Sequence, residues 1–248
     1  MAVSFDEDRW RRVIAGPDWY AVLYPELKRF RDLWVASPDS EGTRRSKREV
    51  REFFEMTLQD GTLALAKSGP NLDAERKRID TIVIHHTSSS PGYALSYMNA
   101  VQLLNIYVPY FNNPGNSIPG EQRLKGTALW SNHVRDGRPV FYAYHWLMRM
   151  DGTFERLLED SELGWHAANW DINCRSVGIC LDNDYEKTDP AADVLQKLAA
   201  FIAGQYPYVA LGRIFGHGEV SKHPTICPGT NFVNSWKAEL LGFIRDGR

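Results

Sequence analysis

Apolar residues in the first third of the chain recur at the three- and four-residue spacing of helices. Ser4 and Glu7 have the spacing of a capping box for a first helix, which Gly16 ends. A second helix follows, and Pro25 either divides it or begins it. The three predicted stripes are Trp10, Val13 and Ile14; Leu23, Leu27, Phe30 and Trp34; and Val50, Phe53, Phe54, Thr57 and Leu58.

From Ile79 onward the pattern changes to short apolar runs, which are typical of buried strands. The pair Asp151-Gly152 predicts a hairpin turn, and Asp189-Pro190 predicts the start of a helix that continues to Gly204. Further helices are expected at 94–106 and at the C-terminus, and a long loop at 112–125. The predicted strands are 79–85, 139–149, 154–158, 176–181 and 213–216.

Strands separated by helices, with one hairpin among them, predict an α/β fold with a mixed central β-sheet flanked by helices. The helical stripes that precede this sheet make a separate N-terminal region. We therefore expect a helical region of unknown role at 1–75, best explained as packing on a second domain at 76–248.

Composition and charge exclude several classes of function. The 248 residues are 43% hydrophobic and carry a net charge of −2, so nothing favours binding to nucleic acid or to an anionic membrane. No apolar run approaches the ~18 residues of a membrane span. The N-terminus turns acidic where a signal peptide would be apolar, so we expect synthesis in the cytoplasm without a signal peptide.

The candidate chemistry lies in two histidine-containing segments. His85 and His86 end the strand at 79–85, and since consecutive strand residues point to opposite faces, only one of them can reach a shared site. Far downstream, His217 lies ten residues before Cys227, and the loop between them also holds His223, a rival ligand. Two imidazoles and a thiolate make a three-ligand zinc site whose fourth position is open, as in catalytic zinc sites. A core histidine and an inert buried thiol are the alternatives.

Five segments in order resemble the zinc-dependent N-acetylmuramoyl-L-alanine amidases, which include phage amidase-type lysozymes and the peptidoglycan recognition proteins. They lie within the last 170 residues or so, from about Ile79 to the C-terminus, and residues 1–78 lie outside the resemblance. The segments are Ile82–Thr87; Ala143–Trp146 before Arg149–Gly152; Gly164–Ala167; Asn173–Ile179; and Gly216-His217 with Thr225–Gly229.

The resemblance implies roles for individual residues. It selects His85, His217 and Cys227 as ligands of one catalytic Zn²⁺. Tyr144 matches the tyrosine that orients the reacting water and stabilises the oxyanion. Thr225 occupies the place of a lysine in some phage members and offers a neutral hydrogen bond instead. Cys180 occupies the place of a glutamate used by another branch, which favours the tyrosine variant of the site.

Further residues are candidates for substrate contact: the imidazole of the Gly164–Ala167 segment, and aromatic side chains able to stack on sugar or peptide. His166, Trp165 and Trp130 are expected to bind substrate, with a structural role as the alternative for His166. Asn173 and Ser176 are predicted to hold the neighbouring loop and strand start through side chain–backbone bonds.

The implied activity is hydrolysis of the amide between N-acetylmuramic acid and L-alanine, by a monomer. The substrate is peptidoglycan or muropeptide, met in the cell wall or in the cytoplasmic muropeptide pool. Two other functions stay open. One is a recognition module that binds muropeptide without cutting it. The other is a structural zinc fold, for which His223 or Cys180 would have to supply a fourth ligand.

Overall fold

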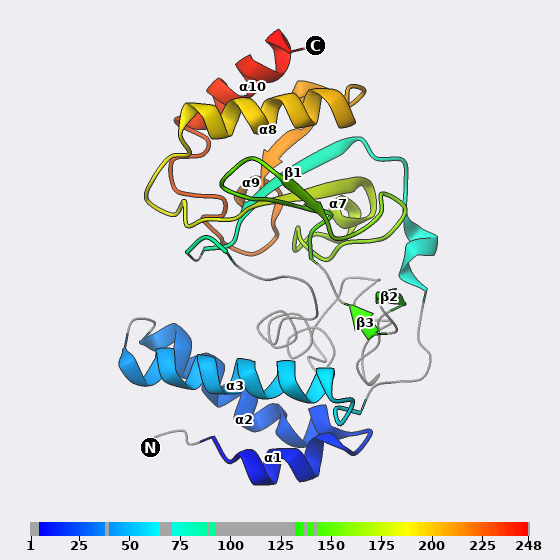
Figure 1. The fold of residues 1–248 in the computed structure, drawn as a ribbon, viewed down its shortest axis with the longest axis vertical. Helices are drawn as coiled ribbons and strands as arrows, with labels where there is room; N and C mark the ends of the chain where they lie inside the picture. The colour runs from blue at the N-terminus through cyan, green and yellow to red at the C-terminus, as the bar shows by residue number, and fades with distance from the viewer. Residues whose placement is uncertain are drawn as a thin grey trace. The chain divides into compact units, whose positions relative to one another are not determined.

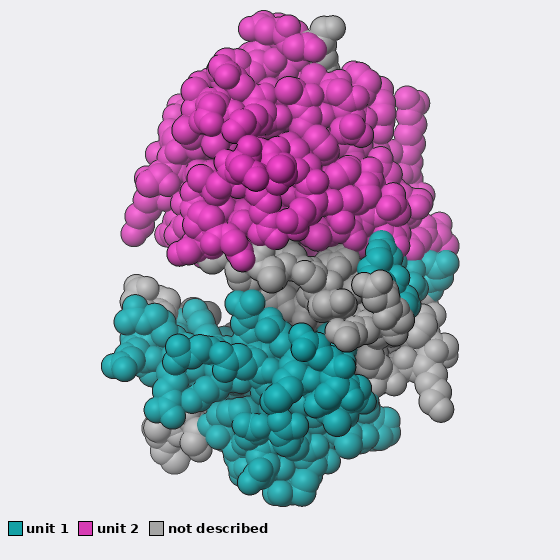
Figure 2. All heavy atoms as spheres, viewed as in Figure 1, with its two compact units in different colours: residues 1–71, 96–141 teal, residues 72–95, 142–248 magenta. Residues whose placement is uncertain are grey.

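The computed structural model describes residues 5–37, 40–64, 71–88, 90–92, 132–135, 138–140 and 143–247. The chain divides into two compact units, coloured separately in Figure 2. One comprises residues 1–71 and 96–141, and the other comprises residues 72–95 and 142–248. The units change over at residue 71, and the domain boundary predicted at residue 75 stays a prediction.

Three helices form the described N-terminal part: α1 (Glu7–Ile14), α2 (Trp19–Ala36) and α3 (Glu41–Gln59). The Asp6 carboxylate caps α1 by accepting from the backbone N–H of Arg9 over 3.0 Å, and the predicted capping residue Ser4 lies outside the described residues. Pro25 lies inside α2, so the expectation that it divides or begins this helix is wrong.

Aromatic side chains hold these helices together around Trp10, which is 0% exposed. Its indole N–H donates to Glu26 over 2.8 Å, which satisfies a polar group that would otherwise be buried alone. The rings around it, with centroids 4.9–6.0 Å away, are Phe5, Phe30, Phe53 and Phe54. The same unit contains a two-stranded antiparallel sheet, β2 (His133–Arg135) with β3 (Arg138–Val140).

The second unit is built on a five-stranded sheet with the order β5-β4-β6-β1-β7 (Figure 1). β1 pairs in parallel with both β6 and β7, β4 pairs in parallel with β6, and β5 joins the edge antiparallel to β4. The predicted α/β class with a mixed sheet is confirmed. The strands are β1 (Thr81–His86), β4 (Trp146–Met148), β5 (Phe154–Arg156), β6 (Ser176–Leu181) and β7 (Ile214–Gly216).

One face of this sheet packs against α8 (Ala192–Gln205) and α10 (Trp236–Asp246), which lie side by side (Figure 1). Ile82 and Ile84 belong to that apolar core, whereas His85 alternates with them and points to the other face. The shorter helices are η1 (Leu72–Glu75), α7 (Trp170–Arg175), η3 (Leu211–Arg213) and α9 (His217–Val220).

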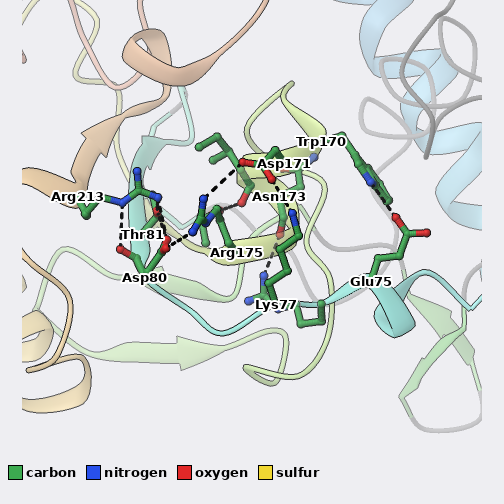
Figure 3. Close-up of polar contacts among 12 residues, drawn as sticks. Glu75, Lys77, Asp80, Thr81, Trp170, Asp171, Asn173, Arg175 and Arg213 are labelled. Carbon is green, nitrogen blue, oxygen red and sulfur yellow. Dashed lines mark hydrogen bonds and ion pairs between the residues drawn. The ribbon is translucent and has the colours of Figure 1, made fainter.

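Asp80 ties together the starts of three neighbouring parallel strands, β6, β1 and β7 (Figure 3). Its carboxylate accepts from Arg213, which precedes β7, over 2.8 Å, and from Arg175, which precedes β6. Thr81, the first residue of β1, donates its hydroxyl to the same carboxylate over 2.6 Å. Burial raises the pKa of Asp80, but these hydrogen bonds outweigh it and hold the pKa below its usual range.

Several predicted boundaries differ from the structure. α8 begins at Ala192, so Asp189 is not its cap, and the expected C-terminal helix is α10, which begins at Trp236. The hairpin is confirmed but shorter than predicted. The helix expected at 94–106 and the loop expected at 112–125 lie outside the described residues. No described helix has both the length and the apolar character required to cross a membrane.

Candidate metal centre

The central strand β1 presents His85 and His86 to opposite faces of the sheet. The imidazole of His86 accepts from the backbone N–H of Tyr185 through Nδ1, over 2.9 Å. His85 is 1% exposed, and the centroid of its ring lies 4.7 Å from the centroid of the His217 ring. The structure therefore separates the two histidines and places His85 with the downstream residues.

The adjacent strand β7 delivers His217, which is the first residue of α9. Gly216 is the N-cap of this short helix, and its N–H donates to the Glu219 carboxylate over 2.8 Å. Lys237 on α10 pairs with both oxygens of that carboxylate, over 2.7 and 2.8 Å. These contacts fix the start of α9 and with it the position of His217.

The loop that follows α9 brings Cys227 back to the same place. The N–H of Gly218 donates to the Cys227 carbonyl over 2.7 Å, and the N–H of Cys227 donates to the Thr225 hydroxyl over 3.2 Å. His223, the rival ligand in this loop, is exposed. The two ends of the segment from Gly218 to Cys227 are thus bonded to each other.

Ligand atoms of His85, His217 and Cys227 lie within 4.8 Å of one another. The Cys227 Sγ is 3.7 Å from His85 Nδ1, close to the separation of about 3.6 Å that tetrahedral zinc with ordinary bond lengths gives a nitrogen and a sulfur ligand. The Nε2 atom of His217 is buried and has no hydrogen-bond partner among the described residues. A divalent cation would satisfy that nitrogen, so the donor set fits zinc.

Burial sets the protonation of these groups. It holds the pKa of His85 well below its usual range, helped by His217 and His166, and lowers that of His217 to about 4. Both imidazoles are therefore neutral, the form that binds metal. Burial raises the pKa of the Cys227 thiol to about 12, although a hydrogen bond from the His86 backbone opposes it. Only a cation at the site would keep this sulfur as a thiolate at neutral pH.

Tyr144 lies beside this group. Its ring centroid is 4.8 Å from that of His85 at an interplanar angle of 47°, and the residue is half-buried. It precedes β4 rather than lying within a strand. Its hydroxyl bonds to Cys180, a contact that lowers the pKa of that thiol against the larger effect of burial, which raises it.

His166 is 4% exposed, and both of its ring nitrogens are engaged. Nδ1 lies 3.0 Å from His85 Nε2, and Nε2 lies 3.0 Å from the Ser176 hydroxyl. Burial, with His145, His217 and Arg76, holds the pKa of His166 well below its usual range. Substrate contact by this imidazole stays a prediction.

The two tryptophans expected at the substrate site are only partly described. Trp165 is half-buried and packs against Trp170 with ring centroids 5.3 Å apart. Trp170 in turn donates its indole N–H to Glu75 over 3.0 Å (Figure 3). Trp130 lies outside the described residues, and both substrate contacts stay predictions.

Of the hydrogen bonds that support the site, the sequence predicted some and not others. The predicted side chain–backbone bonds exist: Asn173 Oδ1 accepts from the N–H groups of His166 and Ala167, and Ser176 donates to the Ile172 carbonyl. The bonds of His166 to His85 and Ser176 carry no sequence signal. Glu219, three residues after Gly216, could have been found from its capping-box spacing.

The fold and this geometry can be compared with known proteins. A family model of N-acetylmuramoyl-L-alanine amidases matches residues 75–230. The chain belongs to this amidase family. The match covers most of the second unit, including all three donor residues, and the predicted resemblance is confirmed. A search of curated proteins finds no match.

Several solved structures are similar to this chain at low identity. The N-acetylmuramoyl-L-alanine amidase LysC from Clostridium intestinale URNW is 22% identical, with a TM-score of 0.41, over 71% of this chain and 94% of its own. The Ph2119 endolysin from a Thermus scotoductus MAT2119 bacteriophage is 18% identical, with a TM-score of 0.40, over 68% and 86%. Drosophila PGRP-LB is 20% identical, with a TM-score of 0.36, over 72% and 91%.

Proposed function

We propose that this amidase-family protein hydrolyses the amide between N-acetylmuramic acid and L-alanine in peptidoglycan or muropeptides, and that it requires zinc. The convergence of His85, His217 and Cys227 carries the proposal, because two neutral imidazoles and a thiolate leave one position open on a tetrahedral ion. Bound there, zinc would supply Lewis acidity toward the amide carbonyl and a lower pKa for water.

Two hydroxyl groups of the chain are proposed to act on the reacting amide. The phenol of Tyr144 lies next to the His85 ring and would orient the attacking water and donate to the developing oxyanion. The Thr225 oxygen accepts from the Cys227 N–H, which leaves its own hydrogen to donate to the same oxyanion. Neither group needs to change charge to do this.

The amide is expected to lie across the open side of the three donors, near the exposed part of the loop between His217 and Cys227 (the ligand loop). Ile226, adjacent to Cys227, is 49% exposed there and offers an apolar contact to the substrate. Trp165 and Trp130 are proposed to contact sugar or peptide. His166 is buried and both of its ring nitrogens are engaged, so contact with substrate would cost it a hydrogen bond.

The two alternatives make different demands on the site. A structural zinc site needs a fourth protein ligand, and within the described part of the chain no further His, Cys, Asp or Glu joins the three donors. A recognition module that binds without cutting would not need Cys227, which is present and in reach of His85. Both observations favour catalysis.

The test uses the full chain and the variants His85→Ala and Cys227→Ala, with His223→Ala as the matched control in the exposed part of the same loop. Zinc content and hydrolysis of peptidoglycan and of soluble muropeptide are measured, with products identified by mass. We expect both ligand variants to lose zinc and activity while the control keeps both. Full activity in either ligand variant would end the proposal, and substrate binding without cleavage by the zinc-loaded wild type would support the recognition module.

A further inference from the structure

A chain of hydrogen bonds runs from the candidate metal centre into the body of the second unit. His85 Nε2 lies 3.0 Å from His166 Nδ1, and His166 Nε2 lies 3.0 Å from the Ser176 hydroxyl. That hydroxyl lies 2.6 Å from the carbonyl of Ile172. All three side chains are buried, so water does not compete for these bonds.

The bond to the Ile172 carbonyl fixes the direction of the other two hydrogen bonds. A carbonyl can only accept, so the Ser176 hydroxyl donates its single hydrogen to the Ile172 carbonyl. The Ser176 oxygen must then accept from His166 Nε2–H. A neutral His166 then has no hydrogen on Nδ1, which accepts from His85 Nε2–H. The remaining nitrogen of His85, Nδ1, carries no hydrogen, and its lone pair faces the Cys227 sulfur 3.7 Å away.

We infer that His166 is a positioning residue, which holds His85 in the Nε2–H tautomer and aims its Nδ1 lone pair at the metal. The inference rests on the proposed zinc function of the site. It gives His166 a role distinct from substrate contact: the imidazole acts on the ligand, not on the amide. Hydrogen bonds of this kind to the far nitrogen of a ligating histidine orient the ring and raise its basicity.

The surroundings of His166 prevent it from taking another orientation. Its backbone N–H and that of Ala167 both donate to Asn173 Oδ1, over 3.2 and 2.8 Å, which fixes the loop. The ring lies directly over Gly178 of β6, where an added Cβ would come within 2.9 Å of the imidazole. It meets the His85 ring edge-on, with centroids 5.1 Å apart at 85°.

Two substitutions separate the hydrogen bond from the bulk of the side chain. His166→Leu fills the space but offers no acceptor, whereas His166→Asn keeps an oxygen at the position of Nδ1. Loss of such a partner typically weakens metal binding by about 10–100-fold. We expect that loss for the leucine variant, measured by zinc competition with a chelator on the full chain, and substantial rescue in the asparagine variant. His223→Leu, an exposed position, is the matched control.

A second readout needs neither zinc nor activity. In the metal-free protein with ¹⁵N-labelled histidine, NMR should detect a coupling between the two nitrogens across the His85–His166 bond, with the proton on His85 Nε2. This measurement stands even if the leucine variant fails to fold. A proton on His85 Nδ1 would overturn the inference, as would unchanged zinc affinity in a folded leucine variant.

The two proposals fail separately. If the wild type binds no zinc and cuts no peptidoglycan but shows the expected coupling, the proposed function is lost and the hydrogen-bond direction stands. If the wild type is an active zinc amidase and His166→Leu leaves its zinc affinity unchanged, only the positioning role is lost.

Discussion

The backbone N–H of Gly218 donates to the carbonyl of Cys227 over 2.7 Å, so the neighbour of one proposed ligand is bonded directly to another. Gly218 also approaches the Thr225 carbonyl so closely that an added Cβ would come within 2.7 Å of that oxygen. The absence of a side chain at this position is therefore a requirement of the ligand loop, because backbone atoms cannot move aside as a flexible side chain would.

Gly218→Ala should push the loop away from α9 and separate His217 from Cys227. We expect zinc affinity to fall about tenfold or more and the free energy of unfolding to fall by about 1–3 kcal/mol. Both are measured on the full chain, by chelator competition and by urea unfolding. Gly242→Ala, in α10 with open space around it, is the control and should keep the affinity. Unchanged affinity in Gly218→Ala would contradict the close packing of the loop.

Tyr144→Phe should remove the proposed catalytic hydroxyl and leave the ring beside His85 in place. Loss of one oxyanion donor typically lowers kcat by about 10²–10³-fold, and we expect a loss of that order with zinc content unchanged. Kinetics on a soluble muropeptide provide the measurement. Tyr208→Phe, at a residue that is 52% exposed, is the matched control. If kcat is unaffected, Tyr144 has no catalytic role.

Asp80→Asn should weaken the second unit in a pH-dependent way. The folded-state pKa of Asp80 lies below its usual value, so its contribution is present above about pH 4 and is lost as the pH falls through that lower pKa. The carboxylate is 37% exposed, and solvent screening limits the effect to roughly 1 kcal/mol at pH 7.

Urea unfolding of wild type and Asp80→Asn at pH 7 and near pH 3 measures this difference. The gap between the two proteins should narrow in acid, whereas Asp246→Asn, an exposed carboxylate on α10, should differ little from wild type at either pH. A gap that stays constant with pH would show that the charge of Asp80 does not stabilise the strand starts.

Trp10→Ala should destabilise the helical N-terminal unit without affecting the metal centre. Truncation of a fully buried tryptophan costs about 3–5 kcal/mol, here through the lost contacts with four phenylalanine rings. Calorimetry should show one transition moving to lower temperature, and zinc affinity should not change. Val22→Ala, at a half-exposed position of α2, is the control. Loss of zinc binding in Trp10→Ala would contradict this expectation and show that the metal centre depends on the packing of the N-terminal helices.

Sequence patterns located the central elements because those elements bury continuous apolar runs. The pattern predicts a strand at 79–85, and β1 lies at Thr81–His86. A strand that is buried on both faces forms a nearly continuous apolar run, which is easy to recognise in a sequence. The start of α8 was misplaced because Asp189 and its proline have the composition of a helix start. In the structure the Asp189 carboxylate accepts from Asn231 and Ser235 instead, over 2.9 and 2.6 Å.

The sequence predicts the three proposed metal ligands of the candidate site, but not the hydrogen bonds that hold those ligands in place. His85, His217 and Cys227 stand in recognisable local motifs, and the fold brings their ligand atoms together. The bond between His85 and His166 joins residues 81 positions apart, and nothing near either one specifies the other. Contacts of this kind arise only when the sheet has set its register, such as the pairing of His85 with Cys180.

The order of the donors along the chain has a consequence for biosynthesis. β1 offers one imidazole early, but the second imidazole and the sulfur follow β7, and Cys227 comes 142 residues after His85. A nascent polypeptide still attached to the ribosome short of β7 therefore holds a single donor, which is too few to retain a metal ion. Capture of the proposed zinc ion would therefore be a late event of maturation, which requires that the last parallel strand has already paired.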